Sequence, residues 1–361
     1  MTRPARVVIN LSALRHNLNR VRTLAPQSRV MAIVKTDAYG HGITRIARAL
    51  PSADAFGVAC LEEARQLRAS GIVQPIILLE GAYAAAELQE IEQLDLDMVV
   101  HEETQIAMLE SARPAKPINA WLKVDTGMHR LGVMPDIFST TWRRLQDCRS
   151  VAQPVRLMTH LATANERTNP MTHAQLACFR QLCGHLPVEK SIANSAGISA
   201  FPESHADWVR PGLMLYGVSP LNGGRAADEG LVPVMSLQSE FIAVKKLRAG
   251  EPVGYGATWR CPEDMPVGVV AAGYGDGYPR HAPSGTPVVL NGKRVALIGR
   301  ASMDMLIVDL RTQPDARVGD PVVLWGDGLP VEEIAHYAGT IPYELLCGVH
   351  KRLRFVEHDE G

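Results

Sequence analysis

Apolar and polar positions follow two different patterns along the chain, and the change falls near residue 230. A short apolar stretch at residues 6–9 leads into helical spacing that starts at Ser12, a candidate helix cap. Eight apolar runs then alternate with amphipathic helical segments. The runs are RVMAIVK, AFGVAC, PIILLE, LDMVV, INAWLKVD, VRLMTHL, KSIAN and DWVR. Continuously apolar strands are typical of a parallel sheet that is buried on both faces.

Eight strand–helix units in about 200 residues predict a (β/α)₈ barrel of the TIM type. The alternative is an open doubly wound sheet, which usually carries a glycine-rich turn after its first strand. No full G-x-G-x-x-G turn follows the first barrel run in this sequence. The pattern therefore favours the barrel.

Beyond residue 230 the helical periodicity fades, and glycine and proline separate short strands. Asn291 and Gly292 lie between two apolar runs and predict a type I′ hairpin, because both turn positions need a positive φ. Residues 221–230 are polar and glycine-rich, as a domain boundary often is. We expect a barrel over residues 1–230, followed by a mostly β C-terminal domain over residues 231–361.

Composition excludes several classes of partner. The 37 Lys and Arg residues balance the 38 Asp and Glu residues, for a formal net charge of −1, so no nucleic-acid or anionic membrane surface is expected. The six cysteines lack C-x-x-C spacing, which argues against a zinc ribbon and a disulfide framework. No acid or thiol completes a metal site around His160, His173 and His185. Without a long apolar segment or a leader pattern, we expect a cytoplasmic protein.

Polar side chains follow five of the predicted barrel strands. They are Lys35, residues 125–130, His160, the pair Asn194 and Ser195, and Arg210. A lysine at a strand end can extend to solvent, and a histidine can be a hydrogen-bonded core residue, so each alone is weak evidence. The carboxyl ends of barrel strands meet at one mouth, however, so together they indicate an active site.

The residue types at this mouth suggest a cofactor. A lysine in apolar surroundings favours its neutral amine, which forms a Schiff base with an aldehyde. Ser195, Gly212 and Leu213 lie in the loops after strands seven and eight, where barrels bind phosphate through backbone N–H groups. A lysine imine beside a phosphate-binding site suggests pyridoxal 5′-phosphate (PLP), an aldehyde that carries a phosphate.

Two other motifs do not support competing activities. GYGDGYP, at residues 273–279, lacks the full G-x-G-x-x-G pattern and the strand-to-helix setting of a nucleotide loop, so we expect only a turn there. The absence of a G-x-S-x-G motif weakens a serine hydrolase interpretation.

Nine motifs together resemble one family over nearly the whole chain. They are AIVKTDAYGHG, LKVDTGMHRLG, MTHLATAN, ANSAG, VRPGLMLYG, VGYGATW, GYGDGYPR, GRASMDM and IPYELLC, and in this order they are similar to the alanine racemases. The resemblance implies interconversion of L-alanine and D-alanine with PLP at the barrel mouth. It also implies a head-to-tail homodimer in which the β domain completes the partner's site.

The resemblance assigns the two acid/base groups. Lys35 would form the Schiff base with PLP and act on one face of the substrate α-carbon. Tyr255, from the partner chain, would act on the other face. Racemisation needs both, because a proton leaves one face and returns to the other. Arg210 would face the pyridine nitrogen, and His160 would link Arg210 to Tyr255.

The resemblance also implies the binding residues. Arg130 would hold the cofactor's phenolic oxygen or the substrate carboxylate, beside Lys123, which is carbamylated in many relatives. Met303 and Asp304 match the partner-chain loop in which the Met303 backbone N–H would meet the substrate carboxylate. The phosphate-binding positions are matched by Tyr39, Ser195, Gly212, Leu213 and Tyr343, with Asn194 as support.

Some positions depart from the family pattern. Ser302 stands where some relatives have cysteine, Asn165 stands where some have an acid, and the tail after Cys347 differs from the usual ending. His41 receives only a structural role.

Three alternatives share Lys35 and the phosphate loops: a broader amino-acid racemase, a PLP barrel decarboxylase and a non-catalytic PLP carrier. A decarboxylase does not need Tyr255 on the opposite face, and a carrier does not need the β domain.

Overall fold

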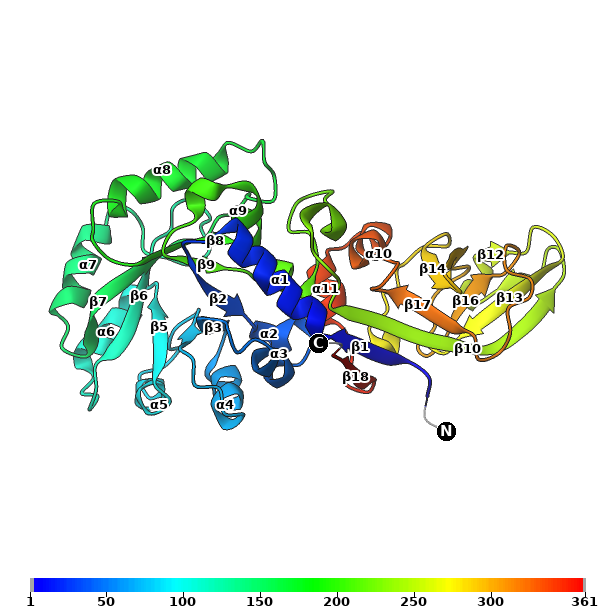
Figure 1. Ribbon diagram of the computed structural model, residues 1–361, viewed down its shortest axis with the longest axis horizontal. Coiled ribbons are helices and arrows are strands. Elements are labelled where there is room, and N and C mark those ends of the chain that lie inside the picture. Colours follow the sequence, from blue (N-terminus) through cyan, green and yellow to red (C-terminus); the bar gives the residue numbers. More distant parts are fainter. Residues whose placement is uncertain (1–2, 360–361) are drawn as a thin grey trace.

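The structure is a computed structural model that describes residues 3–359. It consists of a barrel and a β-rich domain side by side along the long axis of the molecule (Figure 1). None of the helices described is long and apolar enough to cross a membrane.

The predicted (β/α)₈ barrel is confirmed. Eight parallel strands form a closed ring in sequence order, and the ring closes where Arg29 pairs with Trp208. The strands are β2 (Arg29–Ile33), β3 (Ala55–Val58), β4 (Ile76–Leu78), β5 (Leu96–Val100), β6 (Ile118–Lys123), β7 (Val151–Met158), β8 (Lys190–Asn194) and β9 (Trp208–Arg210). Every residue of β3, β4 and β5 is buried, which explains their continuous apolar sequences.

The barrel strands alternate with helices, several of them short. The α-helices are α1 (Leu11–Leu24), α2 (Lys35–Tyr39), α3 (Ile43–Ala49), α4 (Leu61–Ala69), α5 (Glu87–Gln93), α6 (Glu103–Ser111), α7 (Phe138–Asp147), α8 (Met171–Cys183) and α9 (Ser195–Ala200). Three 3₁₀ turns follow, η1 (Pro202–Ser204), η2 (Leu213–Tyr216) and η3 (Ala226–Glu229). The cap expected at Ser12 is wrong: Asn10 caps α1, because its side-chain oxygen accepts from the Ala13 N–H at 2.9 Å.

The predicted β-rich C-terminal domain is also confirmed. Its strands are β10 (Met235–Leu247), β11 (Pro252–Val253), β12 (Trp259–Arg260), β13 (Met265–Val270), β14 (Pro287–Leu290), β15 (Lys293–Ala296), β16 (Leu306–Asp309), β17 (Pro321–Trp325) and β18 (Arg354–His358). Its helical elements are η4 (Tyr255–Ala257), η5 (Tyr274–Asp276), α10 (Val331–Ala338) and α11 (Pro342–Cys347). The hairpin expected at Asn291 and Gly292 joins β14 to β15, with φ values of 49° and 73°.

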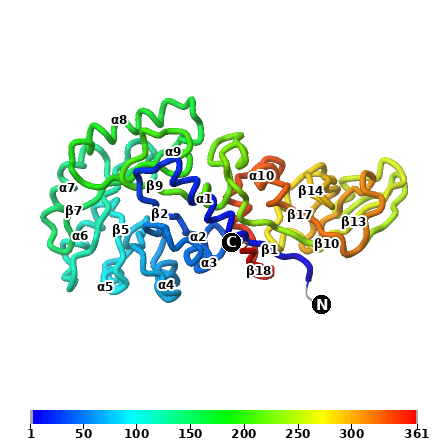
Figure 2. Tube along the Cα trace, in the orientation of Figure 1, coloured from blue at the N-terminus to red at the C-terminus, as the bar shows by residue number. Residues whose placement is uncertain are grey.

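The first strand of the chain belongs to the C-terminal sheet and not to the barrel. β1 (Arg6–Asn10) lies antiparallel to β10 and parallel to β18, so the first and last strands of the described chain lie side by side (Figure 2). The hydrophobic pattern predicts a strand at residues 6–9 but not the strands with which it pairs. For this reason the sequence alone places it in the barrel. The division of the chain at residue 230 stays a prediction.

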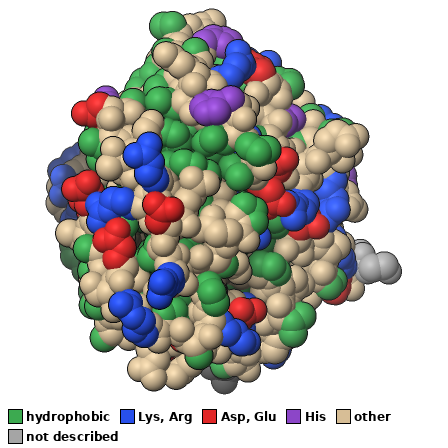
Figure 3. All heavy atoms as spheres, turned by 90° about the vertical axis from the view of Figure 1, so that its left-hand side faces the viewer, with side chains coloured by type: hydrophobic (Ala, Val, Ile, Leu, Met, Phe, Trp, Pro, Cys, Tyr) green, Lys and Arg blue, Asp and Glu red, His purple; other side chains and the backbone are tan. Residues whose placement is uncertain are grey.

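The outer face of the barrel carries mixed charges. Lys and Arg side chains are interspersed with Asp and Glu over this end of the molecule (Figure 3). This view therefore shows no continuous basic surface, in agreement with the balanced composition.

Candidate active site

A cavity of about 1480 Å³ opens at the carboxyl ends of the barrel strands. Residues of α10 and α11 also border it, so it lies where the barrel meets the C-terminal domain. Most of the predicted site residues line this one cavity: Lys35, Tyr39, Lys123, Arg130, His160, Asn194, Ser195, Arg210, Gly212, Leu213 and Tyr343.

The other three predicted residues lie elsewhere on the chain. Tyr255 is 68% exposed and Met303 is 53% exposed, both on the C-terminal domain. Neither they nor Asp304 line the cavity of their own chain. Their participation in a partner's cavity stays a prediction.

Lys35 is followed by an unusual left-handed turn. Residues 36–39 all have φ between 52° and 56°, although none of them is glycine. A left-handed residue with a side chain costs about 1–2 kcal/mol, so the surroundings must stabilise this turn. The Thr36 N–H donates to Glu63 at 2.5 Å, and the Ile43 N–H donates to Asp37 at 2.8 Å. Such strain is concentrated at functional sites, which agrees with a role for Lys35.

His41 holds the end of this turn. Its buried Nδ1 lies 3.0 Å from the carbonyl oxygen of Ala38 and 2.8 Å from that of Tyr39. Burial lowers its pKa to about 4, so the ring is neutral at pH 7 and its proton must sit on Nδ1 to donate to these carbonyls. The structure thus shows what the structural role of His41 is: its ring holds the end of the left-handed turn.

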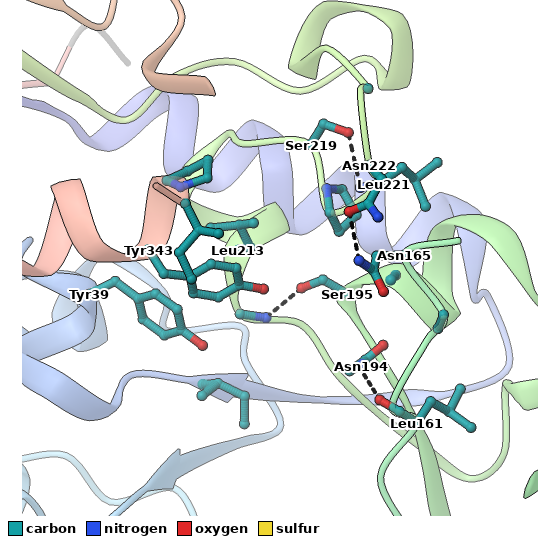
Figure 4. A pocket seen from close by; sticks show the side chains of 18 of the residues that line it. Tyr39, Leu161, Asn165, Asn194, Ser195, Leu213, Ser219, Leu221, Asn222 and Tyr343 are labelled. Atoms are coloured by element: carbon teal, nitrogen blue, oxygen red, sulfur yellow. Dashed lines mark hydrogen bonds between the residues drawn. The ribbon is translucent and has the colours of Figure 1, made fainter. Parts of the chain in front are cut away.

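Close packing against α11 places Tyr39 beside Tyr343. Gly40 has a φ of 78°, and a Cβ there would lie 2.2 Å from the Leu346 carbonyl oxygen. This contact brings the ring centroids of Tyr39 and Tyr343 to 5.7 Å, and the Tyr343 hydroxyl is directed toward Ser195 (Figure 4). The left-handed turn and α11 therefore build one wall of the cavity together.

Backbone N–H groups and hydroxyls gather opposite this wall. Asn194 caps α9 by accepting from the Gly197 N–H at 2.9 Å. Ser195 Oγ accepts from the Gly212 N–H at 2.9 Å and from the Met214 N–H at 3.3 Å. The Ser195 hydroxyl proton is then available for an acceptor in the cavity.

Gly212 allows the Tyr39 hydroxyl to reach the same place. A Cβ on Gly212 would lie 2.5 Å from Tyr39 Oη. Two hydroxyls and the N-terminal turns of α9 and η2 therefore meet at one spot. Such an arrangement suits a phosphate-like anion.

The cavity is also rich in cations. Lys35, Lys123, Arg130 and Arg210 all line it. Burial and the neighbouring charges of Arg210, Arg130 and Lys35 lower the pKa of Lys123 to about 8. Burial lowers the pKa of Arg210 to about 10, so this guanidinium is still charged at pH 7. An excess of positive charge favours an anionic ligand.

Arg210 fixes the state of His160. The guanidinium donates to Ser191 Oγ at 2.6 Å and to the Ile192 carbonyl at 3.2 Å, and its Nη2 lies 3.5 Å from His160 Nδ1. Because arginine can only donate, Nδ1 must accept and the proton sits on Nε2. Burial and the surrounding cations hold the pKa of His160 well below its usual range. The neutral ring therefore offers an N–H donor.

Sequence reasoning missed Tyr216 and Asn222. Tyr216 packs against Tyr39 at 4.8 Å and against His41 at 4.5 Å, and it donates to the Ile33 carbonyl at 2.9 Å. Its signal was present in the motif VRPGLMLYG. Asn222 accepts from Asn165 at 2.6 Å on the opposite side of the cavity, and nothing in the sequence indicates that contact (Figure 4).

Comparisons with known proteins agree with this geometry. The family model for the alanine racemase N-terminal domain matches residues 9–220, and the model for the C-terminal domain matches residues 234–357. The biosynthetic alanine racemase of Escherichia coli (strain K12) is 53% identical over 350 residues, which cover 97% of this chain and 98% of the relative. The alanine racemase of Halorhodospira halophila is 51% identical over 355 residues, 98% of each chain.

Solved structures agree over the same length. The biosynthetic alanine racemase from Pseudomonas aeruginosa superposes with a TM-score of 0.96 at 46% identity, over 99% of this chain and 100% of that one. The alanine racemase from Acinetobacter baumannii superposes with a TM-score of 0.92 at 37% identity, over 99% of this chain and 100% of that one. The similarity therefore includes both domains.

Proposed function

Because this chain belongs to the alanine racemase family and is an isomerase that racemises alanine, we propose that it works with PLP at the barrel mouth and two bases. Lys35 serves one face of the substrate, and Tyr255 of the partner subunit serves the other. The observation that carries the proposal is the single cavity in which Lys35, the cations and the phosphate-like anion site meet.

The residues of the cavity fit PLP in kind. Lys35 offers the amine for its aldehyde, and Ser195, Tyr39, Tyr343 and the backbone N–H groups around Gly212 hold the phosphate. Leu213 and Asn194 complete this set. When bound, the cofactor supplies a conjugated system that stabilises the negative charge left when the α-proton is removed.

Arg210 and His160 orient the reacting groups in this proposal. Arg210 meets the pyridine nitrogen, and because it only donates, it leaves that nitrogen largely unprotonated and so disfavours transamination. His160 donates its Nε2 proton toward the phenolic oxygen of Tyr255 of the partner subunit, which favours the phenolate that a base must be. Arg130 holds the phenolic oxygen of the cofactor or the substrate carboxylate.

We further propose that Lys123 is carbamylated. Its lowered pKa leaves part of the amine neutral at pH 7, and a neutral amine attacks CO₂ to form the N–C bond and release a proton. The resulting anion would orient Arg130. The test is ¹³C NMR of the protein in buffer that contains ¹³C-labelled bicarbonate. A carbamate resonance that the wild type shows and Lys123→Arg lacks supports this assignment. A wild-type spectrum without that resonance contradicts it.

The proposed assembly is a head-to-tail homodimer. Tyr255, Met303, Met305 and Ile341 are large side chains with 68%, 53%, 43% and 59% of their surface exposed. Large contiguous patches of exposed apolar side chains mark contact surfaces, and we propose that these four side chains belong to one. The loop with Met303 and Asp304 would then reach the substrate carboxylate in the partner's cavity.

The proposed role is supply of D-alanine for peptidoglycan in the cytoplasm, with catabolic use of alanine as the alternative. All six cysteines are free thiols, as is usual in a reducing compartment. The Escherichia coli and Pseudomonas aeruginosa relatives are both named biosynthetic.

The proposal is tested with the purified protein, PLP and a panel of L-amino acids in a chiral assay. We expect alanine to be racemised fastest, and racemisation of larger side chains at similar rates would favour a broader racemase. Lys35→Ala should lose the imine absorbance near the visible edge that the wild type shows when PLP is added. A normal spectrum in this variant would show that another lysine binds PLP.

A further inference from the structure

The motif GYGDGYPR contains a buried carboxylate that both ends of the chain contact. The side chain of Asp276 is 0% exposed. It accepts from the Gly273 N–H at 2.9 Å, from Arg352 Nε at 2.8 Å, and from two nitrogens of Arg3, of which Nη2 lies at 2.7 Å. Burial alone would raise its pKa, but the hydrogen bonds from Arg3, Gly273 and Arg352 lower the pKa below its usual value. The carboxylate is therefore charged at neutral pH.

The same motif fixes the loop at residues 302–305. The Ser302 carbonyl accepts from the Tyr274 N–H at 3.0 Å, and the Met303 carbonyl accepts from the Gly275 N–H at 2.9 Å. In a planar trans peptide the carbonyl oxygen and the amide hydrogen point in opposite directions. The bond to the Ser302 carbonyl therefore also sets the direction of the Met303 N–H.

Both arginines that bind Asp276 continue to this loop. Arg352 Nη2 lies 3.4 Å from the Met303 carbonyl and 2.8 Å from the Asp304 carboxylate. Arg3 Nη2 lies 3.0 Å from the Asp304 carbonyl. Three successive peptide groups of the loop thus accept hydrogen bonds. The donors are the two arginines that bind Asp276 and the backbone N–H groups of the turn that contains Asp276.

The glycines of the motif permit this close approach. A Cβ on Gly273 would lie 2.2 Å from the Ser302 carbonyl oxygen, and a Cβ on Gly275 would lie 2.7 Å from Arg352 Nη2. A turn explains the presence of glycines in general. The contacts show that these glycines make room for the 302–305 loop and its arginine.

We infer that Asp276 is a positioning residue: through Arg3 and Arg352 it holds the loop so that the Met303 N–H meets the substrate carboxylate in the partner subunit's site. This inference rests on the proposed function, which gives Met303 that contact. It makes the two ends of the chain part of the substrate-binding apparatus.

The test compares Asp276→Asn and Arg352→Met with the wild-type holoenzyme. The readouts are KM and kcat for L-alanine and the calorimetric Kd for propionate, a carboxylate without the amino group. We expect KM and Kd to rise roughly tenfold, as for the loss of one charged hydrogen bond, with kcat changed less than about twofold. Combining Arg352→Met with Asp276→Asn should add little, because both act through one cluster.

Arg311→Met is the matched control. Arg311 pairs with Asp309 and Glu263 in the same domain, and we expect its loss to leave KM and Kd unchanged. Arg352 is about one-third exposed, so its variant carries the test if Asp276→Asn does not fold.

Two results overturn the inference, and they are distinguishable. If folded Arg352→Met binds propionate and alanine as the wild type does, Asp276 does not position the loop, and the proposed function is unaffected. If propionate does not compete with alanine in the wild type, the carboxylate contact in the proposed function fails and the inference fails with it.

Discussion

Burial sets the protonation of the side chains around Arg210. The pKa of His160 lies well below its usual range, so this ring is neutral at pH 7, whereas Arg210 keeps its charge. A neutral His160 that accepts from Arg210 can only donate toward its other neighbour. In the proposed mechanism that neighbour is the phenolic oxygen of Tyr255 of the partner subunit.

The two-base proposal predicts an asymmetric effect of Tyr255→Phe. Loss of the phenolic oxygen should slow proton removal from L-alanine by about 10²–10⁴-fold, the usual contribution of an acid/base group. Removal from D-alanine should change much less, because Lys35 serves that face. Deuterium incorporation from each enantiomer in single-turnover experiments measures both.

Tyr255→Trp, which retains a large aromatic ring without a phenol, serves as a second variant. Equal losses from both enantiomers in these variants would contradict the assignment of one base to each face.

At the scale of single residues, the sequence predicted which residues lie at the site but not their protonation states. Lys35, Arg210 and Ser195 were placed at one mouth from strand ends alone, and they line one cavity. The tautomer of His160 and the lowered pKa of Lys123 depend on burial and on charges from other strands. The residues next to His160 and Lys123 in the sequence do not determine this burial or these charges.

The left-handed turn shows the limit of prediction at the scale of single elements. Thr36, Asp37, Ala38 and Tyr39 would each be expected in right-handed or extended backbone. Their positive φ values depend on contacts with distant groups, such as the hydrogen bond that the Thr36 N–H donates to Glu63. The hairpin at Asn291 could be predicted, because its conformation follows from the two turn residues themselves.

Packing of this turn against α11 gives a stability prediction. Gly40→Ala should lower the free energy of unfolding by about 1 kcal/mol for the positive φ and by roughly 1–3 kcal/mol more for the clash with the Leu346 carbonyl. Because α11 carries Tyr343, the Kd for PLP should rise as well. Thermal melting and a PLP titration measure the two effects.

Gly71→Ala is the control for this prediction. Gly71 has a φ of 86°, and a Cβ added there would meet no atom within 4 Å, so only the backbone cost applies. If both variants melt at the same temperature, the contact with α11 does not constrain the turn.

The proposed catalytic and substrate-binding residues lie on two separate parts of one chain, the barrel cavity and the exposed surface of the C-terminal domain. Lys35 lies in the barrel cavity, while Tyr255 and Met303 are exposed on the C-terminal domain of the same chain. A complete site then needs two copies of the chain. Activity should depend on protein concentration wherever the dimer dissociates.

Mixed dimers of Lys35→Ala and Tyr255→Ala test the shared site. Each variant alone should be nearly inactive, because both of its sites lack one base. After random exchange, half of the dimers contain both variants and one intact site, so activity should recover to about one quarter of the wild type. Mass spectrometry shows whether the subunits have exchanged. If they have exchanged and activity does not recover, both bases of a site come from one chain.

The overall architecture could be predicted because each half has its own periodicity. The eight apolar runs became the eight barrel strands, and the glycine-rich remainder became the β domain. The position of β1 could not be predicted, because its pairing with β10 and β18 depends on residues far along the chain.

That pairing has a consequence for synthesis on the ribosome. Arg6 and its ladder partner Gln238 are 232 positions apart, and all eight barrel strands are translated between them. At about 5–20 residues per second, β1 waits roughly 10–50 s for β10, and longer for β18. The nascent barrel can close in that time while Val7 and Ile9, which become fully buried, are still exposed. The first strand to be made is among the last to dock, and a chaperone that protects it would act on the growing chain.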